Sequence, residues 1–472
     1  MNNDALLAEL SSKRWFGGQD RAATALKIVE RATISKVPPQ LEIVLATIDF
    51  AGRGRRLYQL LLVGGGGESP SDAIDDPGIL KPIGNLMAHG QSLAGKRGVF
   101  HFAGPGLNPL EPPGGRSVRS IKAEQTNSSF VLDGKVIVKV FRRPEPGPNP
   151  DLELNRLLTS IGFENVPAQV GEITYEGHLD GRRQTVDLAI AQEFIHRGSD
   201  GWNRTVKGVG EILENVRDKT TGRERHDIVE LEGASLFSEL EQLGGVSASL
   251  HVAFSRDDLP AELSPEPARV TDLNAWARRA RTSLTRAMRT QPQVVQGLVE
   301  PATALIDSFK RTPERGVKMR VHGDFHLGQV MLTRKGWMLL DFEGEPSRSL
   351  EERRAKQSPL KDVAGMLRSL NYAASTALFQ KAAPDTEEWH KLEPWADAWE
   401  AIARDRFLSA YRRRSHEAHY LSSDRSALAL MLSFFEFEKA LYELNYEIEH
   451  RPQWVRIPLR GVRSVLRRRR RR

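Results

Sequence analysis

The sequence of 472 residues contains no cysteine, which excludes disulfide bonds, thiolate metal sites and cysteine nucleophiles. It has no apolar run of about 18 residues, so we expect no transmembrane helix. Residues 1–18 lack the basic, apolar and small-residue regions of a signal peptide. With 39% hydrophobic and 27% charged residues, the composition is typical of a globular chain, and a cytoplasmic location is the simplest prediction.

Positive charge is concentrated at the C-terminus. The formal net charge is +7, and residues 467–472 are six consecutive arginines. Without them the balance is +1, from 7 minus 6. We expect this segment to be a disordered, solvated tail that could contact polyanions such as phosphate or anionic lipid. Nothing in the sequence predicts a requirement for nucleic acid.

Apolar, β-branched runs predict strands in the first 200 residues. They lie at 41–50, 56–63, 128–134, 135–141, 170–177 and 185–195. The Asp133-Gly134 pair predicts a tight hairpin between two of them. A helix is predicted to begin at residue 151, because Pro150 precedes acidic residues in its first turn.

Helical periodicity dominates after Trp202. The predicted helices lie at 233–252, 271–290, 294–311, 359–379, 396–413 and 424–447. One polar hairpin pattern, at 321–346, interrupts them. Strand-rich followed by helix-rich sequence predicts an α+β fold rather than a doubly wound parallel sheet. We expect an N-terminal cap domain (1–110), a β-rich intermediate domain (111–200), a mainly helical domain (201–466) and the arginine tail.

The polar hairpin carries the main functional signal. His322-Gly323-Asp324 is followed five residues later by Gln329, and a hairpin pattern then ends at Asp341. Protein kinases use a His-x-Asp motif, an amide residue five positions after the aspartate, and an acidic metal ligand beyond a short hairpin. The first aspartate of such a motif faces the acceptor hydroxyl, and the amide and second carboxylate face Mg²⁺ on the nucleotide phosphates. The spacing therefore indicates phosphoryl transfer.

Other residues of this stretch have less certain roles. Glu343 follows Asp341 by two positions, so both side chains share a face of an extended segment, and Glu343 could bind metal or a sugar hydroxyl. We expect His322 to brace the loop. His326 either lines the substrate pocket or packs as an ordinary histidine.

A phosphotransferase of this type also needs a lysine, on a strand, for the α- and β-phosphates. Lys139 lies between apolar neighbours, and Glu153 on the next helix is its expected partner. Ser128, in a segment of small hydroxyl residues, could donate to phosphate. The carbonyl of Glu193 and the amide of Ile195 are the expected backbone contacts of adenine.

A sugar site should combine carboxylates with aromatic rings. The late segment 434–454 has that composition. Its candidate substrate residues are Glu438, Tyr442, Tyr446, Arg451 and Trp454. The alternative is that these rings form part of the hydrophobic core.

Together these motifs resemble the actinobacterial maltokinases, a family of aminoglycoside-phosphotransferase-like kinases. The resemblance rests on "HGDFHLGQVM", "DFEGEP", "RWFGG", "QTNSSFVLDGKVIVKVFRR", "NPDLELNRLL", "SPLKDVAGMLRSLNYAA" and "RPQWVRIPLRGV". It implies a two-lobed, protein-kinase-like fold with an additional β-rich N-terminal cap domain. By position, it also implies Asp324 as the catalytic base, Gln329 and Asp341 as metal ligands, and Lys139 as the ATP lysine.

The activity implied is transfer of phosphate from ATP, with Mg²⁺, to the anomeric hydroxyl of maltose. The product would be maltose 1-phosphate, which feeds α-glucan (glycogen) synthesis. The catalytic residues alone would serve any hydroxyl. A kinase of another small molecule, such as glucosamine or an aminoglycoside, and a non-catalytic nucleotide-binding protein therefore stay open as alternatives.

Overall fold

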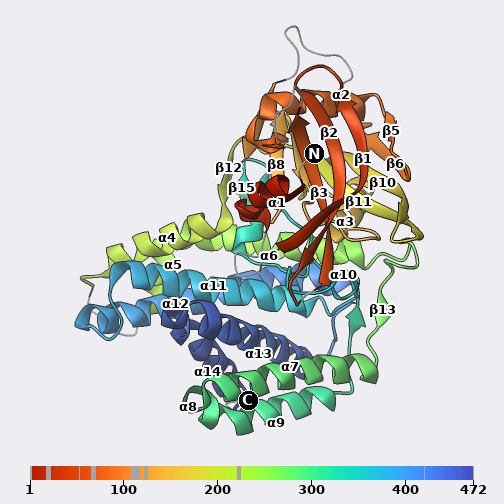
Figure 1. Cartoon of the computed structure of the whole chain (residues 1–472). Helices are drawn as coiled ribbons and strands as arrows, with labels where there is room; N and C mark the ends of the chain where they lie inside the picture. The colour runs from red at the N-terminus through yellow and green to blue at the C-terminus, as the bar shows by residue number, and fades with distance from the viewer. Residues whose placement is uncertain are drawn as a thin grey trace. The chain divides into compact units, whose positions relative to one another are not determined.

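The computed structural model describes residues 3–16, 23–52, 54–64, 71–107, 117–121, 126–219, 225–418 and 420–470. The chain forms two compact units, Met1–Arg197 and Gly198–Arg472. Strands dominate the first unit and helices the second (Figure 1). Among the helices described, none is both long enough and apolar enough to span a membrane.

The first unit begins with a four-stranded antiparallel sheet in the order β1-β2-β3-β4. Its strands are β1 (Ala23–Ser35), β2 (Gln40–Phe50), β3 (Gly54–Gly64) and β4 (Ser71–Asp72). Successive residues of β2 face opposite sides: Ile43 and Leu45 enter one hydrophobic core, and Val44 and Ala46 enter another. The second core is covered by α1 (Asn3–Ser11). Burial of both faces explains why the run predicted at 41–50 is almost continuously apolar.

The second sheet of this unit has seven strands, in the order β5-β6-β10-β11-β9-β8-β7. They are β5 (Ser92–Ala94), β6 (Gly98–Ala103), β7 (Val118–Ile121), β8 (Ser128–Leu132), β9 (Val136–Val140), β10 (Gln169–Leu179) and β11 (Arg182–Glu193). The hairpin at Asp133-Gly134 is confirmed. Both residues have positive φ, 52° and 63°, and the Lys135 N–H closes the turn by donating to the Leu132 carbonyl (2.9 Å). Strands from both sides of residue 110 share this sheet, and the division into domains 1–110, 111–200 and 201–466 stays a prediction.

Two helices accompany these sheets. α3 (Pro150–Ser160) confirms the predicted helix: Asn149 caps it by accepting a hydrogen bond from the Asp151 N–H (2.9 Å). Pro150 occupies the first turn, where its missing N–H costs no helical hydrogen bond. The short helix α2 (Lys81–Ala88), which was not predicted, packs into the core shared by the two sheets.

Helices form most of the second unit. The predicted segments correspond to α6 (Ala234–Phe254), α7 (Val270–Thr290), α8 (Pro292–Val295) with α9 (Val299–Lys310), α11 (Leu360–Lys381), α12 (Glu387–Ser415) and α13 (Arg425–His450). Helices that were not predicted are α4 (Gly201–Val216), α5 (Arg225–Glu232), α10 (Leu350–Arg354) and α14 (Arg456–Arg470). α11 packs against α12 and α13, and α13 packs against α7 and α14 (Figure 1).

The polar hairpin is confirmed within this helical unit. β15 (Val330–Thr333) pairs with β16 (Gly336–Leu339), and β12 (Gly198–Asp200) adds a third antiparallel strand. A separate pair joins β13 (Glu266–Pro267) to β14 (Val317–Lys318). The hairpin therefore stands next to helices that can supply side chains to its loops.

The prediction of a disordered arginine tail was wrong for the described part of the segment. α14 continues to Arg470, because apolar residues at helical spacing, among them Ile457, Val462 and Leu466, are buried along one side. Arg468 donates a hydrogen bond to the buried carboxylate of Glu436 on α13 (2.6 Å). Residues 471–472 lie outside the described residues.

Candidate active site

A buried carboxylate from α11 holds the His-Gly-Asp loop. Asp362 accepts hydrogen bonds from the backbone N–H groups of His322 (2.7 Å) and Gly323 (2.9 Å), and it also bonds to His251 Nε2 (3.1 Å). Burial alone would raise the pKa of Asp362, but His251 and the backbone N–H donors lower it. His322 Nε2 donates to the carbonyl of Leu340 (2.9 Å), which confirms its bracing role.

The carboxylate of Asp324 lies between a lysine and a histidine. Lys439 Nζ, from α13, donates a hydrogen bond to Oδ1 (3.3 Å), and His326 Nε2 lies 3.8 Å from Oδ2. Lys439 Nζ also lies 3.9 Å from Oε1 of Glu345, a buried carboxylate that Arg348 binds through Oε2 (2.5 Å). Burial alone would lower the pKa of Lys439, but Asp324 and Glu345 raise it, so the ammonium group persists across the working pH range.

The protonation of His326 follows from its contacts. Burial lowers the pKa of His326 although Asp324 acts to raise it, so the neutral ring is favoured. Its Nδ1 accepts a hydrogen bond from the Gly328 N–H (3.0 Å). The proton of the neutral ring is therefore on Nε2, the nitrogen that faces Asp324.

The expected metal ligands meet at the end of the hairpin. Gln329 Nε2 donates a hydrogen bond to Asp341 Oδ2 (3.0 Å), and a carboxylate oxygen of Asp341 lies within 4.8 Å of one from Glu343. Asp341 adopts φ 64°, an uncommon conformation for a residue other than glycine. Carboxylate and amide oxygens are the donors that Mg²⁺ prefers, so this group of side chains suits a hard divalent cation.

A pocket of about 320 Å³ lies within the second unit, and its lining includes both His326 and Lys439. Tyr372, Tyr442 and Tyr446 supply aromatic surface to it. It therefore combines aromatic rings with the two residues that flank the Asp324 carboxylate.

Two glutamates also line this pocket, and each is paired with an arginine. Glu443 accepts a hydrogen bond from Arg368 Nε (2.8 Å), and Glu447 accepts one from Arg451 Nη2 (2.8 Å). The Tyr372 hydroxyl donates to Glu447 as well (3.2 Å). The negative charge of both carboxylates is thus balanced by neighbouring guanidinium groups.

The candidate substrate residues divide into two groups. Tyr442, Tyr446 and Arg451 line the pocket, as the sequence pattern suggested. Trp454 is not among the lining residues, although its indole ring lies 5.3 Å from the guanidinium of Arg451. Glu438 is buried and forms an ion pair with Arg279 (3.5 Å).

Lys139 forms an ion pair within the first unit. We expected Glu153 as its partner, but Lys139 Nζ lies 3.0 Å from Oδ2 of Asp151. Asp151 is buried in the first turn of α3, and Glu153, two residues later, points about 200° around the helix. Asn155 Nδ2 fixes Asp151 by donating to its Oδ1 (2.9 Å). Lys139 is thus paired with a carboxylate of α3, and a contact with Glu153 stays a prediction.

Ser128 belongs to an internal hydrogen-bond network. Its hydroxyl accepts from Arg142 Nε (2.7 Å), and Arg142 Nη2 donates to Asp72 (2.6 Å). All three residues are buried, so this network links the two sheets of the unit. The expected contact of Ser128 with phosphate stays a prediction.

The expected adenine contacts lie at the end of β11. The Glu193 N–H donates to the carbonyl of Ala168 (2.9 Å), which holds the segment in place. Gln192 Nε2 donates to Asn155 Oδ1 (3.0 Å), so one chain of hydrogen bonds joins this segment to the Asp151 partner of the lysine. The roles of the Glu193 carbonyl and the Ile195 amide stay predictions.

Sequence reasoning missed Asp362, Lys439 and Glu345. Lys439 lies 115 residues after Asp324, and Asp362 lies 40 residues after His322, so no local spacing relates them. The signals available were weak. Lys439 is the single lysine in the aromatic and acidic segment 434–454, and Glu345 completes "DFEGEP".

Comparisons with known proteins find two family matches and two related kinases. A family described as "Phosphotransferase enzyme family" matches residues 219–395, and one described as "Maltokinase N-terminal cap domain" matches residues 10–76. A glucosamine kinase from Streptacidiphilus jiangxiensis is 29% identical over 353 residues, 72% of this chain and 71% of that protein. A glucosamine kinase from Mycolicibacterium smegmatis is 26% identical over 362 residues, 74% of this chain and 80% of that protein.

Solved structures establish the fold. A glucosamine kinase in complex with glucosamine, ADP and inorganic phosphate superposes with a TM-score of 0.68 at 22% identity, covering 97% of this chain and 98% of that chain. Another crystal form of a glucosamine kinase gives a TM-score of 0.69 at 21% identity, with 95% of each chain covered. The predicted α+β, protein-kinase-like fold with a strand-rich N-terminal cap is confirmed. The two family matches, to a phosphotransferase family and to a maltokinase N-terminal cap domain, support the predicted resemblance to the maltokinase-like, aminoglycoside-phosphotransferase-like proteins.

Proposed function

We propose that the protein is an ATP-dependent sugar kinase that phosphorylates the anomeric hydroxyl of maltose and releases maltose 1-phosphate and ADP. The observation that carries this proposal is the position of Lys439 and His326. Both contact or flank the Asp324 carboxylate, and both line the 320 Å³ pocket. A sugar hydroxyl bound there would lie near a carboxylate able to accept its proton.

In the proposed reaction, Asp324 accepts the proton of the anomeric hydroxyl as its oxygen forms a bond to the γ-phosphorus of ATP. The bond from that phosphorus to the β–γ bridging oxygen breaks, and ADP leaves. Lys139 binds the α- and β-phosphates, and Gln329, Asp341 and Glu343 supply oxygen ligands for Mg²⁺. When bound, Mg²⁺ would offset charge on the β- and γ-phosphates.

The charges of the pocket support a neutral acceptor. An amino sugar carries an ammonium group, which needs an unpaired carboxylate or a desolvated aromatic face. Here Glu443 and Glu447 are each bound by an arginine, and the Lys439 ammonium group shares the lining. Adding a further cation to this pocket would be unfavourable, whereas the hydroxyls of maltose can bond to tyrosine, carboxylate and guanidinium groups alike.

Glucosamine is the second candidate acceptor. It is favoured by the names of both curated relatives, which are glucosamine kinases. The maltokinase cap domain supports maltose instead. The two candidates differ in charge: glucosamine needs a carboxylate that is not paired with arginine, whereas maltose can bind while both glutamates stay paired. An aminoglycoside acceptor also carries ammonium groups, so it would need the same unpaired carboxylate in the pocket.

Acceptor identity can be tested by measuring ADP release with maltose and with glucosamine, and by identifying the product with phosphorus NMR. We expect maltose to be phosphorylated at its anomeric oxygen. The control is Asp324→Asn, which keeps the size of the side chain but is a far weaker base, and it should nearly abolish turnover. Turnover of glucosamine with none of maltose, or a 6-phosphate product, would transfer the assignment to the second candidate.

A further inference from the structure

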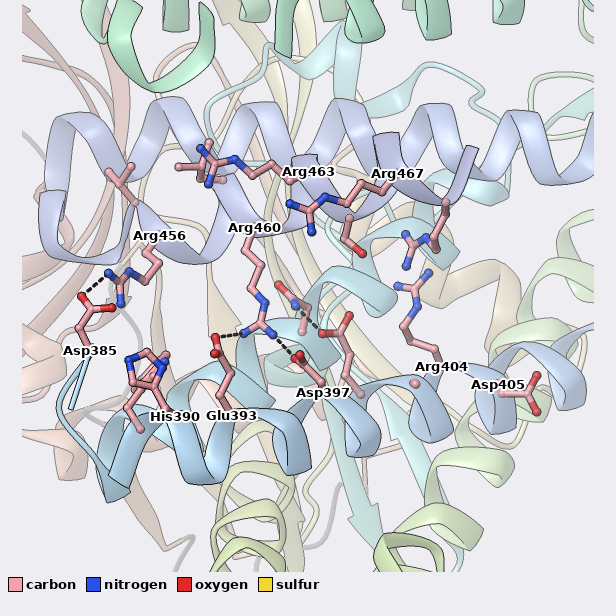
Figure 2. Close-up of a pocket in the computed structure, with 18 of the residues that line it drawn as sticks. Asp385, His390, Glu393, Asp397, Arg404, Asp405, Arg456, Arg460, Arg463 and Arg467 are labelled. Atoms are coloured by element: carbon pink, nitrogen blue, oxygen red, sulfur yellow. Dashed lines mark hydrogen bonds and ion pairs between the residues drawn. The ribbon is translucent and has the colours of Figure 1, made fainter. Parts of the chain in front are cut away.

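A second, larger cleft of about 1130 Å³ lies between α12 and α14, within the second unit (Figure 2). Asn371 of α11 also lines this cleft. The cleft and the smaller pocket have no lining residue in common. Arginines from both helices line it: Arg404, Arg456, Arg460, Arg463, Arg467 and Arg468. The spacing of 456, 460, 463 and 467 along α14 places four of them on one helix face.

One end of the cleft is neutralised by acids. Arg456 Nη2 donates to Asp385 (2.6 Å), and Arg460 contacts both Glu393 (3.2 Å) and Asp397. Figure 2 shows Arg460 crossing from α14 to these two carboxylates of α12. These contacts hold the first turns of α14 and leave no excess positive charge there, because two arginines meet three carboxylates.

The other end has more guanidinium groups than its acids balance. Arg404 and Arg468 share a single buried carboxylate, Glu436 (2.8 and 2.6 Å). Arg463 and Arg467 line the cleft with no ion-pair partner among the residues that the structure describes. Desolvation lowers the pKa of Arg468, Glu436 acts to raise it, and the nearby Arg404 lowers it further.

Two acidic residues also face this end of the cleft and contribute to its charge balance. Glu400 accepts a hydrogen bond from Asn371 Nδ2 (2.6 Å), and Asp405 lies on the exposed side of α12. With Glu436 they give three carboxylates against four arginines, Arg404, Arg463, Arg467 and Arg468. The sequence then adds four more arginines, at 469–472. The local balance is therefore positive before those residues are included.

We propose that this end of the cleft binds a small anion that carries two or more phosphate groups. A concave site with arginines on both walls can surround such an anion, and guanidinium groups match phosphate oxygens with paired hydrogen bonds. Arg463 and Arg467, which have no ion-pair partner in the described part of the chain, are its primary ligands. The site is independent of the proposed catalytic reaction and uses none of its residues.

Isothermal titration calorimetry with inorganic triphosphate, in buffer containing EDTA and no magnesium, tests this proposal. The variant Arg463→Gln/Arg467→Gln should bind about tenfold more weakly for each arginine removed, the effect of one charge-assisted hydrogen bond. Lys139→Met removes the proposed nucleotide lysine instead and should leave this binding unchanged. Triphosphate binding that depends on Lys139 and not on the two arginines would overturn the site while leaving the kinase proposal intact.

A matched control separates a site from general charge. Arg278→Gln/Arg289→Gln removes two exposed arginines of α7, which carry no ion pair among the described residues, and changes net charge equally. It should bind triphosphate like the parent protein. Equal weakening in both double variants would overturn the proposal. So would binding to vesicles of phosphatidylcholine and phosphatidic acid without binding to free triphosphate, since the source of phosphate would then be a lipid surface.

Discussion

Replacing Lys439 by methionine tests how the Asp324 carboxylate is held. Methionine keeps a long unbranched side chain but removes the ammonium group that lies 3.3 Å from Asp324 and 3.9 Å from Glu345. Two carboxylates near the pocket would then lose a shared cation. Glu345 keeps Arg348, whereas Asp324 keeps only the neutral ring of His326, 3.8 Å away, among its charged or titratable neighbours in the described part of the chain.

The cost of this change can be worked from the distances. At an effective dielectric constant of about 20, the two charge pairs are worth about 5 and about 4 kcal/mol before desolvation. Desolvation of the ammonium group offsets much of this attraction. Because the Glu345 side chain is 7% exposed and that of Asp324 is 20% exposed, we expect a net loss of about 3 kcal/mol in the free energy of unfolding. Misplacement of the base by about 1 Å should lower kcat about 100-fold.

The pKa of Glu345 determines how this loss in unfolding free energy depends on pH. Burial would raise the pKa of Glu345, but Lys439 and Arg348 lower it. The stability from this lowered pKa is present above the ordinary carboxyl range and is lost as pH falls through the folded pKa. The difference in unfolding free energy between the parent protein and Lys439→Met should therefore be largest near pH 7 and shrink in acid, where Glu345 becomes protonated.

Urea unfolding at several pH values, with steady-state kinetics on maltose and ATP, measures these effects. The KM for ATP should change little. Lys335→Met, on the exposed turn of the hairpin, is the matched control and should behave like the parent protein. A folded Lys439→Met protein with kcat within a few-fold of the parent value would refute the view that Lys439 positions Asp324.

Three further changes probe other parts of the second unit. Asp341→Ala should weaken Mg²⁺-nucleotide binding and turnover together, and an unchanged Mg²⁺ titration would place the metal elsewhere. Gly461→Ala puts a Cβ 2.0 Å from Nη1 of Arg368, the arginine that binds the pocket residue Glu443. The sugar KM should rise several-fold with little change in the KM for ATP. An unaltered sugar KM would contradict the link between Arg368 and acceptor binding. Arg451→Gln should free Glu447 and raise the ratio of kcat/KM for glucosamine over maltose about tenfold, and a falling ratio would argue against charge-based selection.

The sequence predicted the fold where local chemistry decides it. Turn residues with positive φ defined the hairpin at Asp133-Gly134, and a proline with first-turn acids defined α3. It failed at α14, where a run of arginines was interpreted as a solvated tail. Its apolar residues are interleaved with the arginines, and only packing against α13 shows that they form one buried stripe.

The site was predictable only where its residues are close in sequence. Asp324, Gln329 and Asp341 follow a fixed spacing on one loop and hairpin, so motif and geometry coincide. Asp151 and Glu153 both lie in the first turn of α3, and the sequence does not show which helix face the Lys139 side chain meets. Trp454 was chosen by composition alone, and composition does not distinguish a ring in the lining from one outside it.

Two helices hold different parts of the His322-Gly323-Asp324 loop. Asp362 on α11 binds the backbone of His322 and Gly323, and Lys439 on α13 binds the side chain of the next residue. The first contact is buried and fixes where the loop lies. The second lies at the pocket and fixes where the carboxylate points. Because α13 also carries the pocket residues Tyr442, Glu443 and Glu447, the proposed function assigns acceptor recognition and orientation of the base to one helix. Changes on α13 should therefore alter acceptor affinity and kcat together, whereas changes around Asp362 should act through the stability of the loop.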